Sequence, residues 1–329
     1  MKIYPKCANT FRQWVKSRPQ YVKIYSELGS PKPFDVSLRD GIQALTKEQQ
    51  ESYTLNYKKE LYDSIVTRYE PQEIEIGSLV NDKVLPVFKD TIDFYYLVNE
   101  ENNKDIIVEH GTPSSNESPK KNNYILIPNR DKLQLVLNNT IMNHFSFITS
   151  ASNSFQLKNT RMTVRQMDDE MSSMLYLLED NPFRKYPPLI KVYLSCINEC
   201  PIEGKIDNDY IVHRILMLQK LNISNICLSD TCGSLEPEDF EYIIDTCKLF
   251  GIRMSQISLH LHVKKGEEAR VEQLIQLALA RKITVFDVSV LETGGCSVTM
   301  NKSQLASNLS YDLYYKALAN YIEKCADKQ

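Results

Sequence analysis

The stretch "ISNICLSDTCGSLEPEDFEYIIDTCKLFGIRMSQISLHLHV", residues 223–263, holds a short apolar run, a helical segment and a second apolar run. Pro237 lies near the start of the helical segment, acidic residues fill its first turn, and Gly251 stands where a helix-ending glycine belongs. The flanking runs, 223–230 and 257–263, are predicted to be β-strands. A strand, a helix and a strand in this order indicate a parallel βαβ unit.

The same alternation continues along the rest of the chain. Further strands, each followed by helical periodicity, are predicted within residues 33–38, 73–77, 124–128, 144–149, 188–196 and 283–291. Eight such units predict an α/β fold, a TIM (β/α)8 barrel over residues 33–329. A doubly wound open sheet is the alternative, but no glycine-rich G-x-G-x-x-G turn follows the first strand. We predict an N-terminal extension over residues 1–32 and a long flexible insertion after the second strand, over residues 99–123.

Composition and charge limit the classes of partner. The chain has 329 residues, of which 42% are hydrophobic, and its net charge of −3 gives no argument for nucleic acid or an anionic membrane as a partner. No apolar run approaches the ~20 residues that cross a bilayer. Eight cysteines without a compact framework favour a reducing compartment. The first 26 residues are basic without being serine-rich or clearly amphipathic, so we expect a cytoplasmic and not a mitochondrial location.

Polar residues recur at the predicted carboxyl ends of the strands, where barrel enzymes carry their active groups. In residues 257–263 the alternation of a strand puts His260 and His262 on one face and the apolar residues on the other. Together with Asp40 they would form a divalent-cation site that suits Mg²⁺ or Mn²⁺. The pattern alone leaves two alternatives open: an ion pair between Asp40 and Arg39, and buried hydrogen bonding of the histidines. Zinc at the Cys196–Cys200 segment is disfavoured because no second pair follows at a matching distance.

Five segments resemble, in this order, the 3-hydroxy-3-methylglutaryl-CoA lyases of the DRE-TIM metallolyase superfamily. They are "SLRDGIQ" (37–43), "YLSCINECPIEGKI" (193–206), "ICLSDTCGSLEPEDF" (226–240), "ISLHLHV" (257–263) and "VLETGGC" (290–296). The resemblance implies a Mg²⁺- or Mn²⁺-dependent cleavage of 3-hydroxy-3-methylglutaryl-CoA, or a close 3-hydroxyacyl-CoA, to acetyl-CoA and acetoacetate. It also implies an acyl-CoA or hydroxy-acid substrate and, by analogy, a homodimer.

The resemblance assigns roles to eight residues. The implied cation ligands are Asp40, His260, His262 and Asn308, and the implied catalytic residues are Arg39, Glu75, Asp230 and Cys296. Arg39 would face the thioester oxygen and Glu75 would position Arg39, while Asp230 would assist proton transfer and Cys296 would protonate the acetyl carbanion. The spacing from Cys296 to Asn308 is longer than in the family.

Several positions depart from the family pattern: Ala44 and Leu45 replace an Asn-Glu pair, Val263 replaces an acid, and Glu292 replaces a glycine. The chain also ends soon after the last predicted helix, where the family has residues that help to cover CoA. Two alternatives therefore stay open. One is an aldolase or a Claisen-condensing synthase of the same superfamily that acts on a hydroxy-keto acid. The other is a catalytically inactive barrel used for binding. Cys296 favours the lyase, because the condensing members lack that cysteine.

Overall fold

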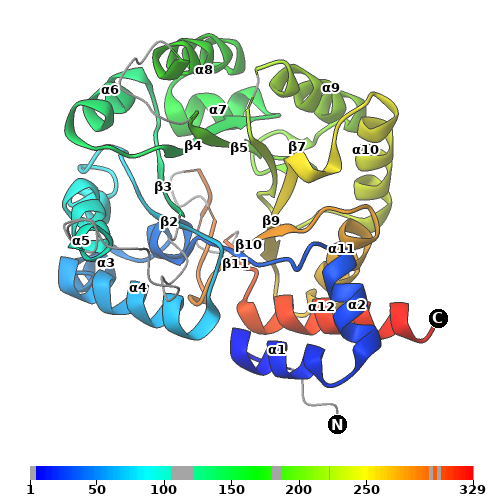
Figure 1. Cartoon of the computed structure of the whole chain (residues 1–329). Helices are drawn as coiled ribbons and strands as arrows, with labels where there is room; N and C mark the ends of the chain where they lie inside the picture. Colours follow the sequence, from blue (N-terminus) through cyan, green and yellow to red (C-terminus); the bar gives the residue numbers. More distant parts are fainter. Residues whose placement is uncertain are drawn as a thin grey trace.

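A computed structural model describes residues 5–104, 122–179, 187–221, 223–295, 299–301 and 305–328. Within these ranges eight strands form a closed barrel in which every neighbouring pair is parallel (Figure 1). In order around the barrel they are β1 (Phe34–Asp35), β2 (Glu73–Ser78), β3 (Asn122–Leu126), β4 (His144–Ser150), β5 (Leu189–Ser195), β8 (Asn225–Asp230), β9 (Ile257–Val263) and β10 (Val285–Val288). The barrel closes because β10 pairs with both β9 and β1.

Helices form an outer ring around the strands, as Figure 1 shows. The helices that connect or follow the barrel strands are α3 (Lys47–Ser52), α4 (Leu55–Tyr69), α5 (Thr91–Lys104), α6 (Arg130–Asn139), α7 (Asn153–Thr160), α8 (Val164–Glu179), α9 (Asn208–Gln219), α10 (Pro237–Leu249), α11 (Glu268–Ala280) and α12 (Tyr311–Ala326). This arrangement confirms the predicted TIM barrel. In the described part of the chain, no helix combines the length and apolar character that a bilayer crossing needs.

The strand β9 shows why the barrel places polar groups inward. Leu259 and Leu261 are buried in the apolar layer between strands and helices, while His260 and His262 project from the opposite face. This alternation confirms the arrangement predicted for residues 257–263. The first strand is shorter than predicted, because the chain turns into a π-helical segment, η1 (Ser37–Gly41), directly after it.

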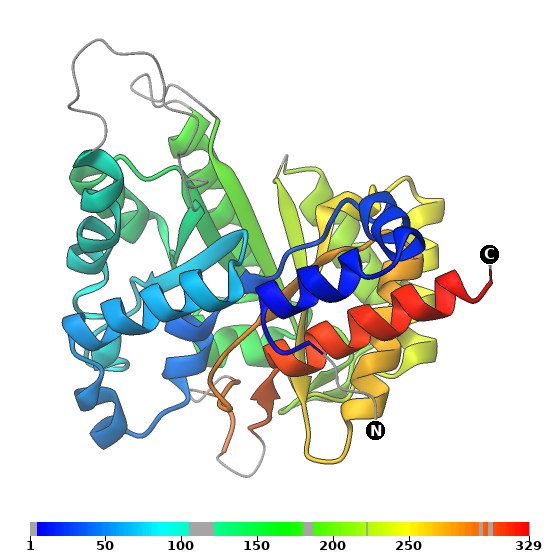
Figure 2. The same cartoon turned by 60° about the horizontal axis from the view of Figure 1, so that its bottom comes forward.

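The first residues form two helices that the sequence analysis missed. They are α1 (Ala8–Lys16) and α2 (Pro19–Glu27), and both lie beside α12 (Figure 2). The helix α1 is amphipathic: it buries Phe11 and Val15, and the ring of Phe11 stacks on Tyr315 with centroids 5.1 Å apart. Burial of this aromatic cluster gives the extension a fixed place on the barrel.

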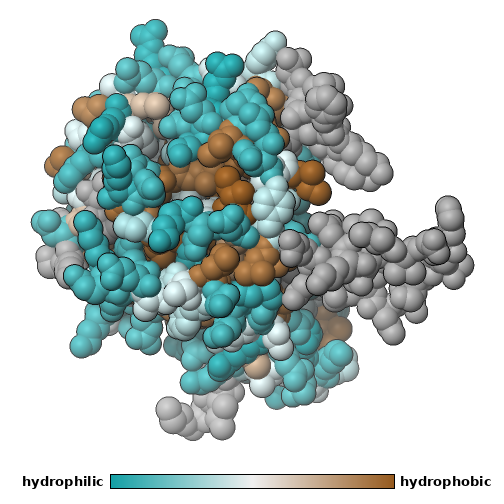
Figure 3. Space-filling model, turned by 90° about the vertical axis from the view of Figure 1, so that its left-hand side faces the viewer, coloured by the Kyte–Doolittle hydropathy of each residue, from teal (hydrophilic) through white to brown (hydrophobic). Residues whose placement is uncertain are grey.

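The predicted insertion is narrower than residues 99–123. Residues 99–104 complete α5, and Asn122 and Asn123 open β3. The expected flexibility concerns residues 105–121, which lie outside the described residues. The structure also contains short elements that the sequence analysis did not predict, namely the pair β6 (Glu199–Cys200) and β7 (Gly204–Lys205) and the strand β11 (Ser307–Asn308). On the side of α3–α6, hydrophilic side chains cover most of the coloured surface, with small hydrophobic groups between them (Figure 3).

Candidate metal centre and active site

A cavity of about 510 Å³ lies at the carboxyl ends of the barrel strands. Its polar wall includes Arg39 and Asp40 after β1, Ser195 of β5, Ser229 of β8 and both histidines of β9. The apolar wall comes from the other side of the barrel and includes Val80, Leu126, Ile148, Phe155 and Met162. The polar strand ends predicted from the sequence therefore do converge on one site.

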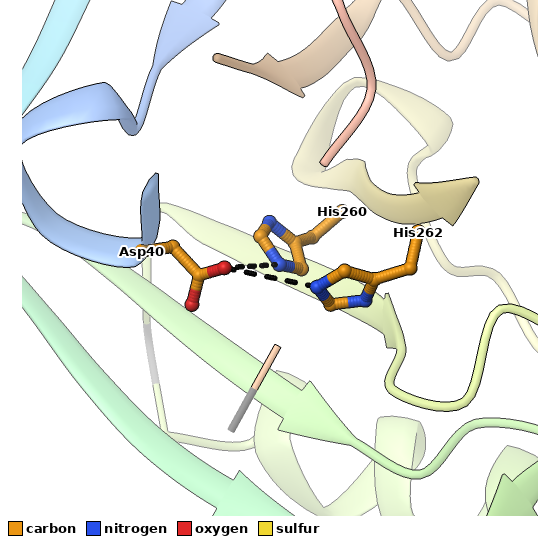
Figure 4. A group of neighbouring side chains, drawn as sticks. All are labelled: Asp40, His260 and His262. Atoms are coloured by element: carbon orange, nitrogen blue, oxygen red, sulfur yellow. Dashed lines mark ion pairs between the residues drawn. The ribbon is translucent and has the colours of Figure 1, made fainter. Parts of the chain in front are cut away.

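Three side chains form a compact cluster inside this cavity. Asp40, His260 and His262 each offer one ligand atom, and these atoms all lie within 4.8 Å of one another. The Oδ2 atom of Asp40 is 3.7 Å from Nε2 of His260 and 3.7 Å from Nε2 of His262, as Figure 4 shows. Among the described residues, this is the group of carboxylates, imidazoles and thiols whose spacing suits a metal ion.

The other nitrogen of each ring is held in place by the protein. The Nδ1 atom of His262 lies 2.9 Å from the main-chain oxygen of Asp230, which only accepts hydrogen bonds. The Nδ1 atom of His260 lies 3.1 Å from Oδ2 of Asp287. Burial alone would raise the pKa of Asp287, but the charge of Lys191 and the contacts with Lys191 and His260 together lower it, so the carboxylate is ionised and accepts. These contacts favour a proton on Nδ1 of each ring, so that Nε2, on the side of Asp40, can bind a cation.

The electrostatics of the cluster favour a positive charge at its centre. Burial by itself raises the pKa of Asp40, but the charge of Arg39 and contacts with the histidines hold it well below its ordinary value. Burial by itself lowers the pKa of His262, yet the nearby carboxylate of Asp40 raises it overall. The cluster thus stabilises a proton or a metal cation beside an ionised carboxylate.

Asn308 reaches the cluster from the short strand β11, which pairs antiparallel with β9 and places Asn308 opposite His262. Residues opposite each other in an antiparallel pair project to the same face. The Nδ2 atom of Asn308 donates to the main-chain oxygen of Thr293 at 3.0 Å. Its Oδ1 atom and Nε2 of His262 are buried, and neither has a hydrogen-bond partner within the described structure. These two unpaired acceptors fit a cation, and a mixed oxygen and imidazole set suits Mg²⁺ or Mn²⁺.

Arg39 lies beside the cluster with its orientation fixed. Its Nη1 donates to Oδ1 of Asp40 at 2.5 Å and its Nε donates to Glu75. The hydroxyl of Tyr193 donates to the same Glu75 oxygen at 3.0 Å, and the guanidinium stands 4.8 Å from the ring centre of Tyr193. Although burial lowers the pKa of Arg39, the neighbouring carboxylates raise it well above its ordinary value. The ion pair between Arg39 and Asp40, one of the alternatives from the sequence, is present together with the cluster.

Asp230 lies behind the cluster. Its carboxylate accepts hydrogen bonds from the main-chain nitrogens of Ser234 at 2.9 Å and Leu235 at 3.2 Å, and burial raises its pKa. Its neighbours Ser229 and Thr231 line the cavity. Successive side chains of a strand point to opposite faces, which explains why Asp230 reaches the site through its main-chain oxygen. Its predicted part in proton transfer stays a prediction.

Cys296 lies outside the described residues, but the residue before it contacts the cluster. The main-chain nitrogen of Gly295 donates to Oδ2 of Asp40 at 3.2 Å. The side-chain nitrogen of Gln43 lies 3.2 Å from the oxygen of Gly295 and 3.3 Å from Oδ1 of Asp40. Gln43 and Gly295 therefore join the loop that leads to Cys296 to the candidate cation ligand.

The sequence analysis missed four residues of this site: Tyr193, Gln43, Asp287 and Lys191. Asp287 and Lys191 carried a detectable signal, because each is a charged residue inside an otherwise apolar strand, "VFDV" and "LIKVYLS". A charge that enters such a strand needs a partner inside the fold. Which partner it finds depends on how the barrel closes.

The fold and site define a class: a TIM-barrel protein with an aspartate, two histidines and an arginine at the carboxyl ends of its strands. No family model matches the sequence. The chain is 28% identical over 225 residues to the hydroxymethylglutaryl-CoA lyase of Bacillus subtilis, which covers 68% of this chain and 66% of that protein. It is 24% identical over 281 residues to the mitochondrial hydroxymethylglutaryl-CoA lyase of Arabidopsis thaliana, covering 85% of this chain and 51% of that protein.

Solved structures agree on the fold. The hydroxymethylglutaryl-CoA lyase of Pseudomonas aeruginosa superposes with a TM-score of 0.71 at 20% identity, over 89% of this chain and 86% of that one. An HMG-CoA lyase of Acinetobacter baumannii, in complex with coenzyme A and 3-methylmalate, gives a TM-score of 0.68 at 22% identity, over 90% of both chains. The chain is therefore similar in sequence to hydroxymethylglutaryl-CoA lyases, as the sequence resemblance predicted, and it shares the fold of their solved structures. The sequence match spans about two thirds of the Bacillus lyase and half of the Arabidopsis lyase.

Proposed function

We propose that the protein is a divalent-cation-dependent carbon–carbon lyase. Its substrate would be 3-hydroxy-3-methylglutaryl-CoA or a close 3-hydroxyacyl-CoA, and its products acetyl-CoA and acetoacetate. The observation that carries the proposal is the convergence of Asp40, His260 and His262 beside Arg39 in one cavity. We assign this activity to residues 33–329, with residues 1–32 as an extension packed on the barrel.

Four side chains would hold the cation. They are Asp40 through a carboxylate oxygen, His260 and His262 through Nε2, and Asn308 through its unpaired Oδ1. Bound there, Mg²⁺ or Mn²⁺ supplies Lewis acidity that lowers the pKa of the substrate's tertiary hydroxyl and fixes its orientation.

Arg39 would stabilise the negative charge that develops on the thioester oxygen when the C–C bond breaks. Glu75 and Tyr193 fix the orientation of the guanidinium, so it needs little reorganisation as negative charge forms on the thioester oxygen. Proton transfers are assigned to Asp230 and Cys296 on the resemblance alone. The homodimer and the cytoplasmic location also stay predictions.

The far side of the cavity supports an acyl-CoA substrate. Lys132, Lys158 and Arg161 line it next to the apolar wall. A thioester of CoA has an apolar and amide-containing arm that ends in phosphates, so a wall that changes from apolar to basic suits it. The Acinetobacter structure supports the proposal, because that protein has the same fold and holds coenzyme A and 3-methylmalate.

The decisive experiment is acetoacetate release from 3-hydroxy-3-methylglutaryl-CoA by metal-stripped protein, before and after Mg²⁺ or Mn²⁺ is added. We expect release that depends on the cation and is lost in Arg39→Met. The matched control is Arg68→Met, an exposed arginine of α4, which should keep full activity. Absence of acetoacetate in a protein that binds Mn²⁺ would contradict the lyase. Free hydroxy-keto acids would then test the aldolase or condensing alternative, and no turnover of either class would favour a binding role.

A further inference from the structure

Two charged residues that the reaction does not use lie buried behind the cation site. Lys191 of β5 is 2% exposed and Asp287 of β10 is 1% exposed. The ammonium of Lys191 donates to Oδ1 of Asp287, and the other oxygen, Oδ2, faces Nδ1 of His260 at 3.1 Å. The carboxylate thus bridges a lysine and a candidate cation ligand, and each oxygen has its own partner.

We propose that Asp287 is a positioning residue that holds His260 in the tautomer able to bind a cation. Lys191 occupies Oδ1 of Asp287 and so leaves Oδ2 as the atom that faces His260. A carboxylate accepts hydrogen bonds and has none to donate, so it selects a proton on Nδ1 of His260. The lone pair then lies on Nε2, which faces Asp40. The inference rests on the proposed function for the identity of the cation, but not for the tautomer.

The two histidines are held in different ways, which makes the inference testable. His262 is held by the main-chain oxygen of Asp230, which no side-chain substitution removes. His260 depends on the Asp287 side chain. Substitution of Asp287 therefore changes one ring and leaves the other as an internal reference.

Lys191 decides what an amide would do at position 287. An ammonium only donates, so in Asp287→Asn it takes the amide oxygen and leaves the NH₂ group facing His260. The ring must then accept at Nδ1 and carry its proton on Nε2, where the cation would bind. In the double variant Lys191→Met with Asp287→Asn, the amide oxygen is free to turn toward the ring, and the Nδ1–H tautomer can return.

The test measures tautomer and cation affinity separately. Histidine nitrogens are labelled with ¹⁵N, the His260 signals are assigned with His260→Gln, and long-range couplings identify the protonated nitrogen in metal-free protein. Binding of Mn²⁺ is measured by calorimetry. In Asp287→Asn we expect an Nε2–H ring and a 10- to 100-fold weaker affinity, and in the double variant recovery of both. The control is Asp35→Asn, a buried barrel acid bonded to Ser37 and Tyr311, which should change neither.

Two further outcomes complete the design. If Asp287→Asn does not fold, the comparison is Lys191→Met with Asp287→Leu, which lacks the acceptor, against Lys191→Met with Asp287→Asn. The first should bind Mn²⁺ more weakly. An Nδ1–H ring and wild-type affinity in Asp287→Asn would overturn the inference and leave an ordinary buried ion pair. A wild-type protein that binds no Mn²⁺ would contradict the proposed function, whereas the tautomer comparison would still decide the part played by Asp287.

Discussion

Asn308 lies directly opposite His262, on a two-residue strand that pairs antiparallel with the carboxyl end of β9 in an otherwise parallel barrel. The pairing brings an amide oxygen from the last loop to the candidate cation ligands. In Asn308→Ala we expect Mn²⁺ affinity to fall at least about tenfold, because the oxygen ligand is lost. Calorimetry measures this directly. Asn138→Ala, at an exposed position of α6, is the control. Equal affinities in both variants would exclude Asn308 as a ligand.

Gly294 provides the space that Asn308 occupies. A Cβ atom at Gly294 would lie 2.8 Å from the main-chain nitrogen of Asn308 and from two of its side-chain atoms. We therefore expect Gly294→Ala to displace the amide and reduce cation affinity and turnover, with a small change in melting temperature. Gly251→Ala should instead lower the melting temperature and leave cation affinity and turnover unchanged. Its φ of +83° strains an L-residue and costs about 1 kcal/mol, but it has open space around it and lies far along the chain from the site.

Glu75 positions Arg39, and its substitution tests whether that orientation matters for the chemistry. In Glu75→Gln, Arg39 keeps its contact with Asp40 and loses its charged partner on Nε. We expect kcat to fall by ~100-fold, while Mn²⁺ affinity changes much less. Glu73→Gln is the matched control, because Glu73 lies on the same strand and bonds to Tyr124 instead. Similar losses in both variants would indicate a general effect of barrel acids on the fold.

The buried carboxyl of Asp35 should make the stability of the fold depend on pH. Burial raises its pKa from 3.8 to about 6, despite hydrogen bonds from Ser37 and Tyr311. The folded state binds the proton of the Asp35 carboxyl more tightly than the unfolded state does. The resulting contribution to the free energy of unfolding is therefore fully present below pH ~4 and is lost as pH rises through 6. Between pH 5 and 7.5, the free energy of unfolding of the wild type should fall by about 1.4 kcal/mol relative to Asp35→Asn. Urea titrations of both proteins at several pH values test this. Parallel pH profiles would contradict the assignment.

The N-terminal helices should contribute stability without touching the site. Phe11 is 2% exposed and packs against Trp14, Tyr25 and Tyr315. Phe11→Ala should lower the free energy of unfolding by about 3–5 kcal/mol, while the activity of the folded fraction stays unchanged. Val22→Ala on the exposed side of α2 should cost less than ~0.5 kcal/mol. A loss of turnover at full folding in Phe11→Ala would show that the extension also acts on the active site.

Local patterns in the sequence determined the strands, most of the helices and the inward face of β9. Alternation with period two separates His260 and His262 from Leu259 and Leu261, and this separation needs no knowledge of the rest of the chain. The Pro237 and Gly251 signals likewise mark α10 closely, because capping depends on neighbouring residues alone.

Only the tertiary structure decided which residues meet. The contacts of Asp287 with Lys191 and His260, of Asn308 with His262, and of Gly295 with Asp40 each join elements far apart in the sequence. They form when the barrel closes and the loop after β10 turns back along β9. Sequence alone marks Lys191 and Asp287 as charges that need partners, because an unpaired buried charge is costly. Which partners they find follows from the register and closure of the barrel, which no local pattern contains.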